Sequence, residues 1–176
     1  MKRNYFLSIV LSLLTLCLMS CESSSLDTKN SATEAYFPEP CLAWGSDMAT
    51  VKSKMLSLGY YLQDVVSSEN EWSMMFYKGD YRCFCESENG KYCFSQVQPL
   101  HTSTAQKVVM NYSKRAKYLG MIVEDDYWTD WLETKDGKTL ICVKSSSSNE
   151  GGLIFYISKN SESGKELYEE LLEDLK

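Results

Sequence analysis

Residues 72–97 read WSMMFYKGDYRCFCESENGKYCFSQV, and this stretch decides the fold class. It holds three strand-like segments, at about Trp72–Lys78, Tyr81–Glu86 and Lys91–Val97, which are rich in aromatic and other apolar residues. Asn89-Gly90 favours a tight turn between the last two segments, because both residue types accept a positive φ. Segments joined by such short connections predict an antiparallel meander.

The residues that precede this meander show the spacing of a helix. Ser46 or Asp47 can cap its amino terminus, and Gly59 suits the left-handed conformation that commonly ends a helix. A further strand-like segment, at about Tyr60–Val66, joins the helix to the meander. Apolar residues at three- and four-residue intervals form one stripe, and they are Met48, Val51, Met55 and Leu58.

A similar pattern of a helix followed by strands recurs 61 residues further along the chain. This recurrence predicts an internal duplication with halves at about 41–98 and 101–159. In the second half Thr102 or Ser103 starts the helix, and Gly120 ends it. The matched positions are Leu58-Gly59 with Leu119-Gly120, Asp64 with Asp125, Gly90 with Gly151, and Phe94 with Phe155. The second helix presents Ala105, Val108, Val109, Tyr112, Ala116 and Leu119. Its strands are expected at about Met121–Glu124, Tyr127–Thr134, Thr139–Lys144 and Leu153–Ser158.

Residues 161–176 are predicted to close the chain as a helix, with Ser163 and Glu166 at the spacing of a capping box. Leu167, Leu171 and Leu175 would face the core. The predicted fold is therefore α+β: two tandem helix-plus-antiparallel-meander repeats with helices on one sheet face, and a C-terminal helix, in a single domain at 41–176. In outline this topology is similar to that of the β-lactamase inhibitor proteins, from which no inhibitory residue carries over.

The amino terminus has the features of an export signal. Lys2 and Arg3 precede an apolar run too short to span a membrane as a helix. Residues 18–21, Leu-Met-Ser-Cys, resemble the lipobox of bacterial lipoproteins. That resemblance implies a signal peptide at 1–20 and a diacylglycerol on Cys21, which would become the first residue. An ordinary signal cleaved nearby and an uncleaved anchor remain the alternatives.

Residues 21–40 are polar and show no apolar period, so they are expected to form a lipidated flexible tether. The folded part then opens with Trp44-Gly45, and with Val51 and Met55 at this spacing it resembles uncharacterised envelope lipoproteins of the Bacteroidetes. The resemblance implies a place in the cell envelope, on the periplasmic or outer-surface face, and no known activity.

The net charge of the chain limits the classes of partner that it is expected to bind. The chain carries 18 basic and 24 acidic residues, and loss of the signal leaves a net charge of about −8. An acidic surface argues against nucleic acid and against anionic lipid headgroups. The expected partners are a membrane, reached through the covalent lipid, and an envelope protein or glycan.

Five cysteines besides Cys17 and Cys21 lie in the folded part, and buried, unpaired thiols are the favoured interpretation. A two-residue turn at Asn89-Gly90 would place Cys85 opposite Phe94, whereas a three-residue loop would place it opposite Cys93. A zinc site built on Cys83, Cys85 and Cys93 would need His101 or Cys142 as a fourth ligand, so no metal is expected. The five are Cys41, Cys83, Cys85, Cys93 and Cys142.

No catalytic residue or cofactor is assigned. A Cys–His hydrolase would depend on the one histidine, His101, and no Gly-x-Ser-x-Gly occurs. Paired carboxylates beside aromatics are typical of glycosidases, and the segment Glu124–Glu133 has this composition, although such residues also fill ordinary strands and turns. Its carboxylates are Glu124, Asp125, Asp126, Asp130 and Glu133, and its aromatic residues, a candidate binding surface, are Tyr127, Trp128 and Trp131.

Three functions are consistent with these features. The first is a non-enzymatic, membrane-anchored binding or scaffolding module of the envelope. The second is a carbohydrate-active or hydrolytic enzyme of the periplasm that uses the segment Glu124–Glu133, and the third is a protein inhibitor of a hydrolase. Two carboxylates in one pocket would favour the enzyme, whereas a sheet surface with exposed aromatic residues would favour a protein partner.

Overall fold

The computed structural model describes residues 38–100, 102–146 and 152–175. The predicted signal peptide, Cys21 and the tether up to residue 37 lie outside the described residues. The described part belongs to one compact unit, and it contains no helix with the length and apolar character needed to cross a membrane. The elements are α2 (Met48–Ser57), β1 (Tyr61–Ser67), β2 (Trp72–Lys78), β3 (Tyr81–Glu88), β4 (Lys91–Leu100), α3 (Thr102–Ser113), β5 (Ala116–Glu124), β6 (Tyr127–Thr134), β7 (Thr139–Ser146), β8 (Gly152–Ser158) and α4 (Glu162–Asp174).

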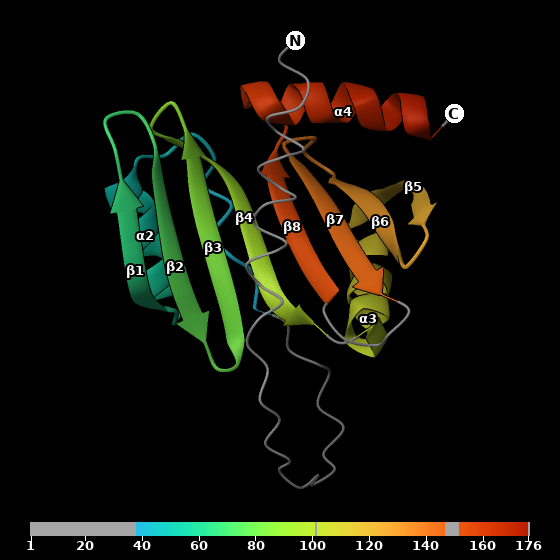
Figure 1. Cartoon of the computed structure of the whole chain (residues 1–176), viewed down its shortest axis with the longest axis horizontal. Helices are drawn as coiled ribbons and strands as arrows, with labels where there is room; N and C mark the ends of the chain where they lie inside the picture. Colours follow the sequence, from blue (N-terminus) through green and yellow to red (C-terminus); the bar gives the residue numbers. More distant parts are fainter. Residues whose placement is uncertain (1–37, 101, 147–151, 176) are drawn as a thin grey trace, which may run out of the picture. The chain divides into compact units, whose positions relative to one another are not determined.

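The strands form one eight-stranded antiparallel sheet in the order β1-β2-β3-β4-β8-β7-β6-β5. Each half of the chain contributes a helix and a four-stranded meander, and the two meanders join where β4 pairs with β8 (Figure 1). The predicted α+β fold class, with its repeated helix-plus-meander order and C-terminal helix, is confirmed.

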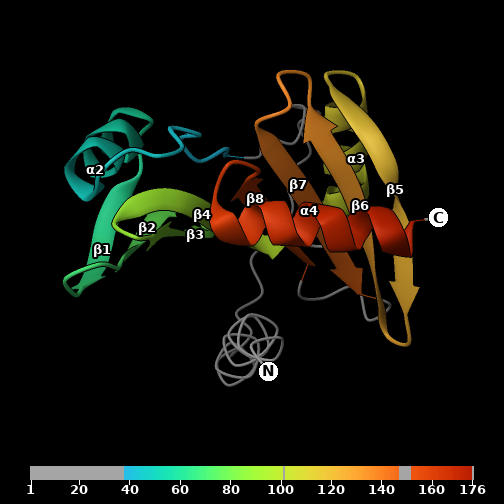
Figure 2. The same cartoon turned by 90° about the horizontal axis from the view of Figure 1, so that it is seen from above.

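Helices cover both faces of the sheet, and each face has its own apolar cluster. The repeat helices α2 and α3 lie on one face, which we call the repeat-helix face, and α4 lies on the other, the α4 face (Figures 1 and 2). The larger cluster joins Val51, Met55, Ala105, Val108 and Tyr112 of the helices to Met74, Phe76, Cys83, Cys85, Leu132, Ile141, Val143, Ile154 and Tyr156 of the strands. The smaller cluster packs Leu167, Leu171 and Leu175 on Trp131, Leu140, Cys142, Phe155 and Ile157.

The first repeat helix has the predicted boundaries. The Asp47 side chain caps α2 by accepting the Thr50 N–H at 2.8 Å, and Gly59 adopts a φ of 83° just beyond its end. This left-handed conformation is open to glycine because the residue has no Cβ to clash. The chain therefore turns from α2 directly into β1.

The second repeat helix is shorter than predicted, and the assignment of Gly120 as its end was wrong. α3 stops at Ser113, and β5 begins at Ala116, which pairs with Thr134 of β6. Gly120 lies inside β5, where a Cβ would stand 2.6 Å from the Leu175 side chain. This glycine therefore permits α4 to pack closely on the sheet.

These boundaries correct the 61-residue alignment. Asp64 lies in β1 whereas Asp125 lies in the turn after β5, so that match was wrong, as was the match of Gly59 with Gly120. Phe94 and Phe155 do occupy the fourth strand of each half, and their ring centroids are 5.9 Å apart across the β4–β8 pair. Gly151 lies outside the described residues.

The cap of the C-terminal helix lies two residues before Ser163, so the predicted capping box was wrong. Ser161 caps α4, since its Oγ accepts the Gly164 N–H at 3.1 Å. Glu88, at the end of β3, accepts the N–H groups of Glu162 and Ser163 at 2.8 and 3.1 Å. A carboxylate at a helix amino terminus is stabilising, so this contact fastens the first meander to α4.

All five cysteines of the described part are buried, and none of them forms a disulfide. The turn at Asn89-Gly90 has two residues, but a register shift after Glu86 places Cys85 opposite Ser95 instead of the predicted Phe94. Burial is the main cause that raises the pKa of Cys41 to about 11 and that of Cys93 to about 12. Thiols with such pKa values stay protonated at neutral pH and are poor nucleophiles.

Candidate binding surface

The aromatic residues of the segment Glu124–Glu133 do not share one surface, because successive strand residues point to opposite faces. Trp131 is buried beneath α4 and donates its Nε1–H to Thr129 Oγ1 at 3.1 Å. Tyr127 lies on the same α4 face, under the Lys144 ammonium at 3.4 Å. Trp128 lies on the repeat-helix face, so the sheet separates it from the other two aromatic residues.

The carboxylates of this segment are likewise dispersed. Asp125 and Asp126 are exposed in the β5–β6 turn. Asp130 accepts the Tyr118 hydroxyl at 2.8 Å on the repeat-helix face. Glu133 forms an ion pair with Lys159 on the α4 face. Because Asp130 and Glu133 lie on opposite faces, these two carboxylates cannot act on one substrate, and the enzyme alternative gains no support from this pair.

None of the other candidate sites is assembled by the residues that the structure describes. His101 lies outside the described residues. Cys85 and Cys93 do not stand opposite each other, and Cys93 Sγ lies 3.7 Å from the Glu86 carbonyl oxygen. Within the ranges that the structure describes, no group of three or more His, Cys, Asp or Glu side chains is placed to hold a metal ion.

One half of the α4 face has a different character. The apolar residues of α4 pack on β5–β8 and on Phe94, and the cluster that they form includes no described residue of β1–β3. Figure 1 shows these strands with α2 behind them. We call this half the open face, and it presents Tyr61, Val66, Ser73, Met75, Tyr77, Arg82, Phe84, Glu86 and Gln96.

Aromatic side chains stand at the centre and one end of the open face. Tyr61 of β1 and Tyr77 of β2 stand directly across from each other and stack, with ring centroids 5.4 Å apart. Met75 pairs with Phe84 in the next row of the same face. These side chains are half-buried or exposed, and Arg82 lies beside Tyr77. The open face thus combines apolar area with a guanidinium.

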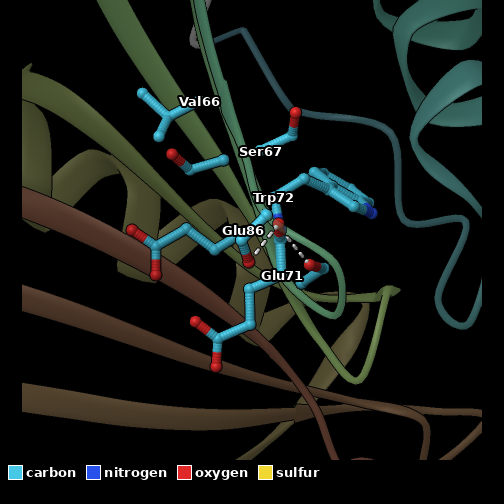
Figure 3. Close-up of a pocket in the computed structure, with 8 residues that line it drawn as sticks. Val66, Ser67, Glu71, Trp72 and Glu86 are labelled. Atoms are coloured by element: carbon cyan, nitrogen blue, oxygen red, sulfur yellow. Dashed lines mark hydrogen bonds between the residues drawn. The ribbon is translucent and has the colours of Figure 1, made fainter.

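The other end of the open face is hollowed into a cleft of about 360 Å³ (Figure 3). It lies where the β1–β2 turn meets β3. The turn is fixed by the Ser68 N–H, which donates to the Glu71 carbonyl at 2.8 Å, and by the Trp72 N–H, which donates to Ser87 Oγ at 2.7 Å. The cleft is lined by Val66, Ser67, Ser68, Glu71, Trp72, Ser73, Glu86 and Ser87.

The cleft is acidic, because the carboxylates of Glu71 and Glu86 both line it. Burial raises the pKa of Glu86, and the nearby charge of Glu71 raises it further. A carboxyl group in such a place holds its proton more tightly than an exposed one. The lining supplies carboxyl and hydroxyl groups but no histidine or thiol. This arrangement suits hydrogen bonding to a polar or cationic group of a partner.

The shifted pKa of Glu86 gives a testable pH dependence. The folded chain binds this proton more tightly than the unfolded chain, so the free energy of unfolding falls as pH rises from the ordinary pKa of 4.5 through the folded pKa. The Glu86→Gln variant is expected to lose this part of the slope and to be more stable than the wild type at pH 7. Urea unfolding of both proteins between pH 4 and pH 8 checks this. Parallel stability profiles would contradict it.

Sequence reasoning missed the open face for a physical reason. Glu71 and Glu86 are distant along the chain and meet only because Ser73 pairs with Glu86 in the β2–β3 register. The available signal was the alternation of Ser73, Met75 and Tyr77 with the core residues of β2. When only the sequence is known, apolar residues at these positions look the same as those of a strand that is buried on both faces.

Comparisons of the chain with protein-family models, with curated proteins and with solved structures found no match. The class of protein is therefore defined by the fold and the surface alone: an α+β domain with a single large sheet, half of one face of which is open.

Proposed function

We propose that the chain is a lipid-anchored envelope lipoprotein that acts as a non-enzymatic binding module and holds a protein partner on the open face. The single observation that carries the binding role is this half-sheet, which α4 does not cover and on which aromatic side chains gather. Tyr, Met, Phe and Arg are the residue types enriched in protein interfaces. The acidic cleft beside them would set the orientation of the partner through polar contacts.

The attachment of the tether supports an anchored module. At its carboxyl end, the Pro38 carbonyl accepts the Tyr60 hydroxyl at 3.0 Å, and Glu39 forms an ion pair with Arg115. The chain from Cys21 thus arrives at a fixed point on the repeat-helix side of the domain. Lipid on Cys21 would then hold the domain near a membrane, and the tether would leave it free to engage a neighbour.

Photo-crosslinking in intact cells tests the binding role. A photoreactive phenylalanine analogue placed at Tyr77 of the full lipidated chain is expected to give a discrete crosslinked envelope protein. The matched control carries the same analogue at Lys52, an exposed residue of α2 on the repeat-helix side, and should give no such product. Identical products from both positions, or none from Tyr77, would reject the open face as the partner site. If the captured protein is a hydrolase whose activity falls on binding, the inhibitor alternative replaces the scaffold.

A further inference from the structure

The sheet is open at both edges, and β5 forms one of them with β6 as its single neighbour. The β5–β6 turn has two residues, so the flanking Glu124 and Tyr127 exchange hydrogen bonds. By the same alternation, Ile122 bonds to Thr129, whereas Met121 and Val123 turn their backbone N–H and C=O groups away from β6. Such outward groups form a template on which another strand can pair.

Three large apolar side chains are exposed along this edge. Tyr118, Met121 and Val123 are 46, 51 and 67 % exposed, and all three lie on the repeat-helix face. The opposite edge differs, because Asp64 of β1 accepts the N–H of its neighbour Val65 at 2.8 Å. A side chain that occupies a backbone donor in this way hinders pairing there. β5 is therefore the edge better suited to a further strand.

The sequence of β5 complements itself in one antiparallel register. When Met121 is placed opposite Met121 of a second copy, the register shift between Tyr118 and Gly120 brings Val123 opposite the second copy's Tyr118. The same shift brings Glu124 opposite its Lys117. An aromatic residue then faces a β-branched one on the repeat-helix face, and opposite charges face each other on the α4 face. Both kinds of cross-strand pair are stabilising, and twofold symmetry makes each occur twice.

We propose that a second copy of this chain occupies the β5 edge, so that two domains join into one continuous sheet through antiparallel β5 strands. This inference goes beyond the proposed partner binding and does not depend on it. The open face lies on β1–β3 and Gln96 of β4, and the dimer edge lies on β5, at the far end of the strand order. A dimer would present two open faces, and the lipids of two chains would hold it at the membrane.

Disulfide trapping tests the predicted register. Hydrogen-bonded residues that stand opposite in antiparallel strands have Cα atoms about 5.5 Å apart, which is within the range that a disulfide spans. The full lipidated chain with Met121→Cys, mildly oxidised in detergent, is expected to give a reducible dimer. Met110→Cys, at a position of α3 that is more exposed than Met121, is the control and should stay monomeric. Equal trapping at both positions, or trapping of Met121→Cys to a different protein in cells, would overturn pairing with a second copy.

A charge exchange tests the same contact without a crosslink. Lys117→Glu and Glu124→Lys each place like charges across the dimer, and each is expected to weaken self-association about tenfold or more. Mixing the two variants restores opposite charges at both contacts, so a heterodimer should form with near wild-type affinity. A substitution that only disturbed the folding of its own chain would not be rescued by mixing it with the other variant. Sedimentation of the wild type as a monomer throughout the micromolar range, or no response to the exchange, would refute the proposal.

Discussion

The Cys21→Ala variant is expected to lose all incorporation of labelled palmitate and to leave the membrane fraction. The lipobox resemblance implies that the Cys21 thiol accepts the diacylglycerol, and alanine offers no atom to which the lipid could attach. Each buried methylene of an acyl chain contributes about 0.8 kcal/mol to membrane binding, so removal of the chains removes most of the attraction to the membrane. Metabolic labelling followed by fractionation measures both effects.

The matched control is Cys17→Ala, which removes a thiol from the same segment but leaves the proposed acceptor in place. Its labelling should equal that of the wild type. Palmitate retained by Cys21→Ala would show that the lipid is attached elsewhere, and the anchoring account would then be wrong. Labelling lost from both variants would point instead to a general defect in export.

The Tyr92→Ala variant is expected to be destabilised by about 3–5 kcal/mol, the usual cost of truncating a buried aromatic residue. Tyr92 is fully buried, and its ring lies 4.6 Å from that of Trp44 and 6.1 Å from that of Trp72. Its hydroxyl donates to the Cys41 carbonyl at 2.8 Å, and its backbone bonds to Gly45 and Ser46. The tyrosine therefore joins the segment that enters the domain to the sheet.

Tyr92→Phe separates the hydroxyl from the ring. It keeps the stacking and leaves the Cys41 carbonyl without this donor, a loss of about 1–3 kcal/mol for a buried group. Urea unfolding at neutral pH gives both free energies from the midpoint and slope. A loss below about 1 kcal/mol in the alanine variant would mean that the entering segment is not held as the structure shows.

The fold was largely predictable because local signals agreed with tertiary pairing. The Asn89-Gly90 turn, the Asp47 cap and Gly59 each act over a few residues, so a single sequence suffices to recognise them. The end of α3 was different. Tyr112, Ala116 and Leu119 continue a helical spacing, yet pairing of Ala116 with Thr134 draws this stretch into β5. A contact between residues so far apart leaves no local trace, and it overrides the helical preference.

The candidate surface was less predictable than the fold. Tyr127, Trp128 and Trp131 looked like one patch because they are neighbours in sequence, but strand alternation places Trp128 on the opposite face and α4 buries Trp131. The face to which α4 would attach was also not determined by its leucine spacing. The open face exists only because α4 covers half of the sheet, and this depends on the whole topology.

The central claim is that a protein partner sits on the open face, and differential capture tests it most directly. The full lipidated chain, the Tyr61→Ser/Tyr77→Ser variant and the control Leu56→Ser/Leu58→Ser, changed at exposed residues around α2, are isolated from membranes in mild detergent. The retained proteins are then compared by quantitative mass spectrometry. The account predicts an envelope protein that wild type and control retain equally and that falls at least tenfold with the tyrosine variant. Equal retention by all three chains would contradict it.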